Sequence, residues 1–152
     1  MRAADRQRGV AAVEFALLAS ILLMIAFSAT EFGRAFYYYN TLVKASRTAA
    51  REFSFGGPKG TVTSREDAAK CLAVYGKRPC NSKNDVPILE DLTLVLVDIG
   101  ATTTETFSAG GVSYSYSFFC VTINGFPFRS VVWWILPDIK FGEIKTCMRQ
   151  AV

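Results

Sequence analysis

The longest apolar run of the chain extends from Val10 to Thr30. It reads VAAVEFALLASILLMIAFSAT and holds one charged residue, Glu14. A helix of this length would measure about 32 Å, which is enough to cross the hydrocarbon core of a bilayer. A cleaved secretory signal has a shorter apolar run, of ~7–15 residues, and a small-x-small cleavage site at its end. Here the helical pattern continues without a break, so we expect a membrane anchor.

The helical pattern reaches beyond the apolar run to the Gly-Gly-Pro turn at residues 56–58. Apolar and small side chains recur at alternating spacings of four and three, which predicts one face of a helix. This face consists of Phe32, Phe36, Tyr39, Val43, Ser46, Ala50 and Phe53. A single helix over residues 10–53, transmembrane over about 10–31, would be roughly twice as long as a bilayer core is thick. We therefore expect its outer half to pack on the C-terminal domain through this face, while subunit contacts along the inner half are compatible with that packing.

Residues 54–152 are expected to form a domain outside the membrane. Its first part is a turn-rich linker over 54–63, then a short helix over about 65–76 and a loop that reaches Pro87. Residues 92–97 are apolar on both faces, which is typical of a central strand.

Two further strands are predicted in the last third of the chain. Serines alternate with apolar residues over 112–120, which predicts a strand with one face toward a core or a helix. That face consists of Val112, Tyr114, Tyr116, Phe118 and Cys120. Residues 139–149 are the candidate for a last strand. The predicted fold is therefore α+β: a long N-terminal transmembrane helix that continues out of the membrane and packs on a small antiparallel sheet.

The segment FPFRSVVWWILP, residues 126–137, has two interpretations. Its apolar run from Val131 to Leu136 is too short to span a membrane. It could be a buried strand or a short core helix. Alternatively, Trp133 and Trp134 could lie at the membrane interface or against another subunit, because tryptophan favours both places.

The four cysteines all follow the apolar run. They are Cys71, Cys80, Cys120 and Cys147. None forms a C-x-x-C pair and the chain has no histidine, so a zinc site is a poor explanation. An even number of cysteines beyond a membrane anchor indicates two disulfides in an oxidising compartment. Of the three possible pairings, Cys71–Cys80 with Cys120–Cys147 is favoured, because the second pair would join two expected strands.

Charge and composition argue against nucleic-acid binding and catalysis. The net charge is +4, but residues 1–9 supply half of it and the other basic residues are scattered. Without histidine the chain can hold no His-dependent triad or His general base. The adjacent carboxylates Glu66-Asp67 and Glu90-Asp91 are expected on the solvated surface, and no phosphate-binding glycine loop is present in the sequence. We expect no enzyme activity, no metal or other cofactor and no small-molecule substrate.

Glu14 is an unusual residue for its place in the chain. A carboxylate in the bilayer centre costs ~2.5 kcal/mol or more, and less near the edge. An acid near a helix N-terminus is instead favourable, because it complements the helix dipole. Glu14 would have this position if the helix began at about Val10, and cutting the chain after Gly9 would produce that arrangement.

The residues from Arg8 to Phe15 resemble the prepilin-peptidase site of type IV pilin-like proteins. In that pattern a basic leader ends in glycine, cleavage follows it, and glutamate is the fifth residue of the mature chain. Phe15 after the glutamate and a leader of nine residues are similar to the Flp branch. The stretch RGVAAVEFALL and the continued helix FGRAFYYYNTLVKASRTAARE are similar to TadE-like minor pseudopilins of tight-adherence pilus systems. The resemblance is strong over 8–53 and only architectural over 54–152, and the chain is too short for the added domain of TadG-like relatives.

The resemblance implies a pilin-like fold and a role in pilus assembly. Residues 1–9 would be a cytoplasmic leader, Gly9 and Val10 the processing site of a prepilin peptidase, and Glu14 and Phe15 assembly residues. Expected partners are that peptidase, other pilin-like subunits, inner-membrane assembly proteins and the lipid bilayer. The protein would lie in a bacterial inner membrane, or in the pilus, with its C-terminal domain periplasmic or extracellular. Counts of Lys and Arg on the two sides of the run are equal and do not orient it, but the cysteines favour this direction. The alternative function is an uncleaved, single-pass anchored binding or sensor domain.

Overall fold

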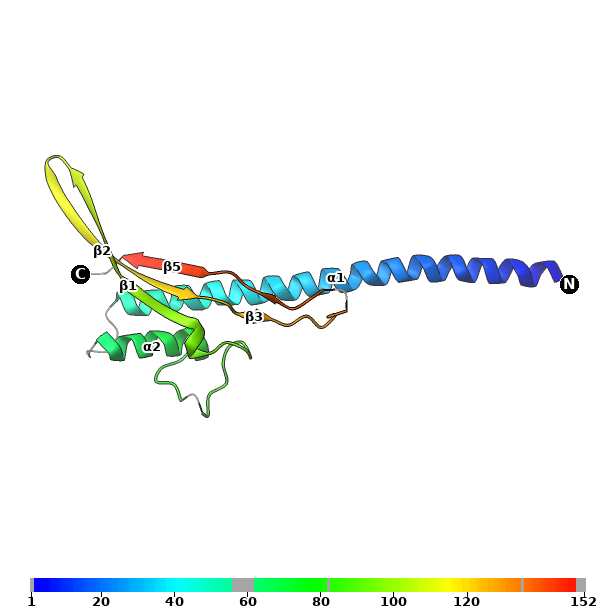
Figure 1. Cartoon of the computed structure of the whole chain (residues 1–152), viewed down its shortest axis with the longest axis horizontal. Coiled ribbons are helices and arrows are strands. Elements are labelled where there is room, and N and C mark those ends of the chain that lie inside the picture. Colours follow the sequence, from blue (N-terminus) through cyan, green and yellow to red (C-terminus); the bar gives the residue numbers. More distant parts are fainter. Residues whose placement is uncertain (1, 56–61, 82, 135, 150–152) are drawn as a thin grey trace.

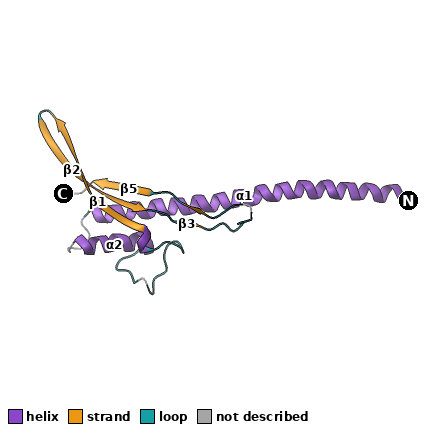
Figure 2. Cartoon of the chain, in the orientation of Figure 1, coloured by secondary structure: helices purple, strands orange, loops and turns teal. Residues whose placement is uncertain are grey.

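The computed structural model describes residues 2–55, 62–81, 83–134 and 136–149. Figure 1 shows a long helix that carries a second helix and a small sheet along one half of its length. Helices and strands are distinguished in Figure 2. The elements, in chain order, are α1 (Arg2–Ser54), α2 (Val62–Tyr75), a 3-10 helix (Leu94–Leu96), β1 (Val97–Ala109), β2 (Val112–Ile123), β3 (Pro127–Phe128), β4 (Ile139–Lys140) and β5 (Ile144–Arg149). The predicted α+β architecture is confirmed.

The N-terminal half of α1 stands free of the rest of the chain (Figure 1). Its large apolar side chains from Val10 to Phe27 are exposed, and none of its most apolar stretch is buried. In the described part of the chain, α1 is the helix that is long and apolar enough to cross a membrane. The helix begins at Arg2, so the expected leader is helical in the uncut chain. No proline interrupts residues 2–9, and Gly9 costs only about 1 kcal/mol relative to alanine in a helix.

The predicted packing face of α1 is correct near its C-terminus and wrong near the apolar run. Ser46, Ala50 and Phe53 are buried, and Val43 packs against the core. In contrast, Phe32, Phe36 and Tyr39 are exposed. The buried face instead follows Tyr38, Leu42, Ala45 and Ala49. Alanines form much of this face because α2 lies close by, with Ala69 and Ala73 fully buried against the same core.

β2 lies between β1 and β5 in an antiparallel three-stranded sheet. Its inner end packs on α1, where the Phe53 and Phe119 rings meet edge-on at 4.7 Å. The hydroxyls of Ser46 and Thr146 also share a hydrogen bond of 2.8 Å between α1 and β5. The outer end of the β1–β2 hairpin projects beyond the helix (Figure 1).

Two of the strand predictions are wrong in detail. Residues 92–97 are not a central strand: Leu94–Leu96 form a 3-10 helix, and β1 starts at Val97 and lies at a sheet edge. Their apolar character comes from Leu92, Leu94 and Leu96, which pack against the core before the strand begins.

In β2, the face that packs toward α1 is the one opposite to the predicted face. Phe119, Val121 and Ile123 pack into the core. On the predicted face, Cys120 is buried, whereas Val112 and Tyr114 are exposed. The reason is that the outer half of β2 extends past α1, so the alternation there does not correspond to burial.

The remaining elements agree more closely with the sequence. α2 covers the predicted short helix and starts at Val62. The candidate last strand, 139–149, is divided into β4 and β5 by residues 141–143. Of the predicted linker over 54–63, residues 56–61 lie outside the described residues.

Both favoured cysteine pairs are present in the structure. Cys71 of α2 is bonded to Cys80, and Cys120 of β2 is bonded to Cys147, its direct partner on β5. The loop after α2 is also held by Lys77, whose ammonium lies 2.7 Å from the Asp85 carboxylate. The hydrogen bond from Lys77, followed by one from the Asn81 backbone, lowers the pKa of Asp85.

Non-reducing peptide mapping of the native protein should therefore find peptides linked through Cys71–Cys80 and Cys120–Cys147, with no thiol that alkylates before reduction. Changing both Cys120 and Cys147 to serine should lower the free energy of unfolding of the C-terminal domain by about 2–4 kcal/mol, because the unfolded chain gains conformational freedom. Alkylation of all four cysteines without reductant would contradict an oxidising, outward location of this domain.

Candidate functional site

The expected processing site, Gly9-Val10, lies on an exposed surface of α1. A Cβ atom built on Gly9 has no heavy atom within 4 Å, and Val10 is largely exposed. No described segment covers this part of the helix (Figure 1). The peptide bond is therefore open to an external enzyme, and glycine makes local unwinding easier than any residue except proline.

Glu14 and Phe15 are also exposed on α1. On a helix, a side chain meets those three and four positions away. Around Glu14 these neighbours are all apolar: Val10, Ala11, Leu17 and Leu18. Across the described ranges, no hydrogen bond or ion pair involves the Glu14 carboxylate. A partner for this charge must therefore come from the helix terminus, from water or from another molecule.

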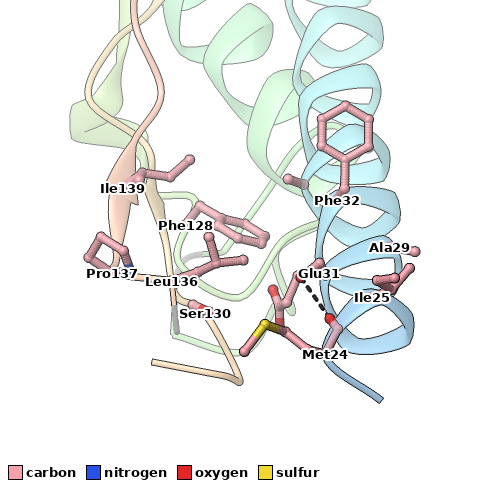
Figure 3. A pocket seen from close by; sticks show the side chains of 12 residues that line it. Met24, Ile25, Ala29, Glu31, Phe32, Phe128, Ser130, Leu136, Pro137 and Ile139 are labelled. Carbon is pink, nitrogen blue, oxygen red and sulfur yellow. Dashed lines mark hydrogen bonds between the residues drawn. The ribbon is translucent and has the colours of Figure 1, made fainter. Parts of the chain in front are cut away.

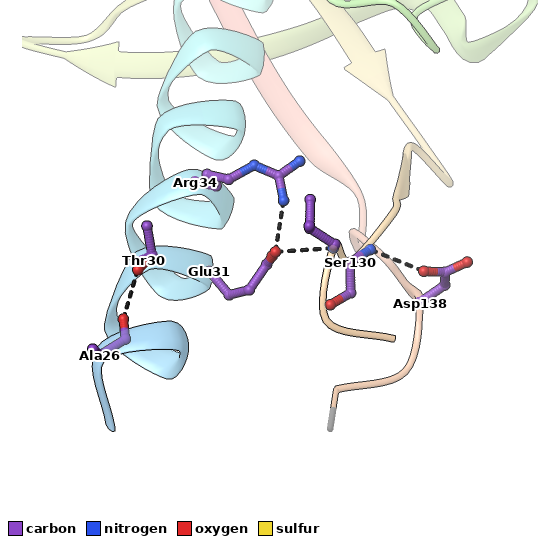
Figure 4. A network of polar contacts seen from close by, with 7 residues as sticks. Ala26, Thr30, Glu31, Arg34, Ser130 and Asp138 are labelled. Atoms are coloured by element: carbon purple, nitrogen blue, oxygen red, sulfur yellow. Dashed lines mark hydrogen bonds and ion pairs between the residues drawn. The ribbon is translucent and has the colours of Figure 1, made fainter. Parts of the chain in front are cut away.

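A second site, which the sequence did not reveal, lies where α1 meets the C-terminal domain (Figure 4). Glu31 is only 4% exposed. Its Oε1 accepts a hydrogen bond of 2.7 Å from Arg34 and one of 2.9 Å from the backbone N–H of Val131. Val131 belongs to the loop between β3 and β4. The backbone N–H of Ser130 donates to Asp138 Oδ1 at 2.9 Å, and this bond closes the base of that loop.

The sequence held one signal for this site. Glu31 directly follows the apolar run and has Arg34 three positions later, a spacing that permits an ion pair on a helix. Its burial depends on Val131, which is 100 positions away in the chain. No local pattern could have indicated that contact.

Trp133 and Trp134 lie on this loop and are 72% and 64% exposed. For the segment 126–137, the buried-strand interpretation holds at the start, where Phe126 and Phe128 are buried and β3 forms, and it is wrong for residues 131–134. Residues 131–134 form turns, and of the apolar side chains described there only Val132 is buried. The loop lies against α1 rather than in the core, because its backbone N–H at Val131 donates to Glu31 of the helix.

An apolar cavity of about 720 Å³ lies between α1 and the two ends of this loop (Figure 3). Its walls include Met24, Ile25 and Phe32 from the helix and Phe128, Leu136 and Ile139 from the domain. The end of the apolar run and the loop that bears the tryptophans therefore line the same cavity. Its walls provide few polar groups, and Glu31 is the charged residue among them.

The adjacent carboxylates Glu66-Asp67 and Glu90-Asp91 are exposed or half-exposed. Asp67 and Glu90 are exposed, and Asp91 forms an ion pair with Arg129 at 3.4 Å. Within the described ranges, no cluster of three His, Cys, Asp or Glu side chains could hold a metal ion. The expectation that the chain is not an enzyme stays a prediction.

The family model described as TadE-like protein matches residues 9–51 of the chain. The match begins at the glycine of the expected processing site and covers Glu14, Phe15 and Glu31, ending within the last turns of α1. No match to a curated protein or to a solved structure was found. The resemblance drawn from the motif and the helix after it is confirmed over residues 9–51, where the chain matches the TadE-like family model.

Proposed function

We propose that the protein is a minor pilin-like subunit used to assemble a tight-adherence pilus. Its family associates it with pilus components, and its exposed apolar helix is suited to single-pass anchoring. In this proposal the leader lies in the cytoplasm, α1 crosses the inner membrane and the disulfide-bonded domain lies outside. The protein acts by binding other subunits and catalyses no reaction.

Glu14 is the observation that supports this proposal most directly. Its carboxylate is exposed on an otherwise apolar helix surface, and its helix neighbours offer no counter-charge. A charge in lipid is costly unless it is paired. Cleavage after Gly9 by a prepilin peptidase would create a positive amine on Val10. If Glu14 of one subunit meets that amine on a neighbour, each charge offsets the other's cost of leaving water.

The experiment is a deletion of the gene for this chain in a strain with a working tight-adherence system. We expect surface pili, counted by electron microscopy, to fall strongly, and a plasmid copy of the full chain to restore them. Affinity-tagged protein should also co-purify with other pilin-like subunits from detergent extracts. Normal piliation in the deletion strain would contradict the proposal and favour the anchored binding or sensor domain.

A further inference from the structure

Residues 130–134 and 136–138, here called the Trp loop, lie between β3 and β4 and beside α1 at Glu31 (Figure 4). This is the level at which the apolar run ends. The stretch from Val10 to Thr30 measures about 32 Å at the helical rise, close to the thickness of a bilayer core. If α1 spans a bilayer with this stretch, the outer surface of the hydrocarbon lies at the level of the Trp loop.

The position of the Trp loop along α1 is fixed by specific contacts. Glu31 accepts the Val131 N–H at 2.9 Å while Arg34, one turn further along, holds the same carboxylate oxygen. Val132 is buried, and Ser130 and Asp138 close the base of the loop. The loop therefore cannot slide along the helix without losing these bonds and exposing Val132.

The tip of the Trp loop presents large apolar side chains to the surroundings. They are Val131, Trp133, Trp134 and Leu136. The two indole rings meet edge-on with centroids 6.4 Å apart. Charged groups flank this tip, with Arg129 before it and Asp138 after it. An apolar tip with a polar border, and tryptophan at its centre, is the composition found at membrane–water interfaces.

We propose that the Trp loop inserts Trp133 and Trp134 into the interface of the same bilayer that α1 spans. A lipid surface is favoured over a protein partner because the loop and the span form one continuous apolar surface. Met24 and Ile25 of the span and Leu136 of the loop line the same cavity (Figure 3), so lipid that covers the span also reaches the loop. The inference rests on the proposed anchoring by α1. Two points of attachment would limit the tilt and rotation of the outer domain and so fix the direction of its surface.

The chain is well suited to a test, because its two tryptophans both lie on this loop. The full chain would be reconstituted at low density into phosphatidylcholine vesicles with acyl chains brominated near the headgroup or near the bilayer centre. We expect at least a twofold loss of tryptophan emission with the shallow bromolipid, a smaller loss with the deep one, and weak quenching by aqueous acrylamide. The single variants Trp133→Phe and Trp134→Phe assign the signal to each ring.

Two reporters calibrate depth in a chain with both tryptophans changed to phenylalanine. Leu22→Trp places the reporter in the middle of the apolar run, and Phe55→Trp places it on an exposed site beyond the end of α1. The native tryptophans should fall between these two. Quenching of Leu22→Trp without quenching of the native pair would overturn the inference and leave the anchoring intact. If neither Leu22→Trp nor the native tryptophans are quenched by bromolipid, both the anchoring and the inference are overturned. Emission that shifts to shorter wavelength only as protein density rises, without bromolipid quenching, would overturn it in favour of a subunit contact.

Glu31 serves as a positioning residue in this arrangement. Glu31→Ala removes the acceptor for the Val131 N–H and should make the two tryptophans at least twofold more accessible to acrylamide. Glu31→Gln keeps an oxygen for that bond and should restore most of the native quenching profile, which a purely electrostatic role of Glu31 would not allow. An unchanged profile in Glu31→Ala would show that other contacts set the height of the loop.

Discussion

Replacement of Gly9 by leucine should leave the chain in the membrane, folded and uncut. In the structure, a Cβ at this position has no heavy atom within 4 Å, so leucine disturbs no contact in the described chain. Leucine also favours the helix by about 1 kcal/mol relative to glycine. Intact-mass analysis of membrane-extracted protein should show a wild-type chain of 143 residues (152 minus 9) beginning at Val10. The Gly9→Leu protein should keep Met1 and all 152 residues.

Gly33→Leu is the matched control for this experiment. Gly33 lies on the same helix, and a Cβ there also has no heavy atom within 4 Å. The substitution and the gain in helix propensity are thus the same at both positions. Gly33→Leu should be processed like the wild type. Equal cleavage of both variants, or a wild-type chain that keeps Met1 in cells with an active prepilin peptidase, would contradict processing at Gly9.

The sequence was most informative where a local pattern determines the structure. The unbroken helix, its apolar run and the short α2 follow from periodicity and from the turn residues that end them. The favoured disulfide partners, Cys120 and Cys147, are present because two segments that were expected to be strands do lie side by side.

Burial was harder to predict, because it depends on which distant segments meet. The aromatic positions Phe32 and Phe36 suggested the packing face of α1, yet small residues such as Ala45 and Ala49 are the buried ones. Alanine carries a weak hydrophobic signal, but it lets two helices approach closely. In β2 the serine alternation identified a strand without showing which part of it would lie over α1.

Two of the acids on α1, Glu14 and Glu31, differ in the partners available to their carboxylates. Glu31 is buried and bound by Arg34 and the Val131 N–H, so this chain supplies its partners. Glu14 lies 17 positions earlier, about 25 Å away along the helix by the helical rise, where the apolar run surrounds it. The two bonds to Oε1 give Glu31 a structural role, while its Oε2 is buried without a hydrogen-bond partner among the described groups. For Glu14 the remaining explanations are the dipole of a helix that starts at Val10 and a charged group from a neighbouring subunit.

Replacement of Glu14 by valine should separate these explanations. Removing the charge makes insertion into lipid no worse, because a charged side chain at the bilayer centre costs ~2.5 kcal/mol or more. The outer domain makes no described contact with this part of α1, so its disulfides and the tryptophan emission should be unchanged. In the proposed processing, cleavage depends mainly on Gly9, so it should continue. We therefore expect normal membrane levels and a normal mature N-terminus.

Assembly is the property that Glu14→Val should abolish, because in the proposed pairing the Val10 amine of a neighbouring subunit would lose its counter-charge. Pilus counts should fall strongly, and co-purification of pilin-like partners should be lost. Glu14→Gln should behave in the same way, since it keeps the shape but not the charge, whereas Glu14→Asp should retain part of the function. Ser20→Val is the control: it removes an exposed polar group from the same run, one that bonds only the Leu17 carbonyl, and it should leave piliation unchanged. Full piliation of the Glu14→Val strain would show that assembly does not need the carboxylate. The helix dipole would then suffice to explain it, because a cut at Gly9 places Glu14 near the positive end of the helix.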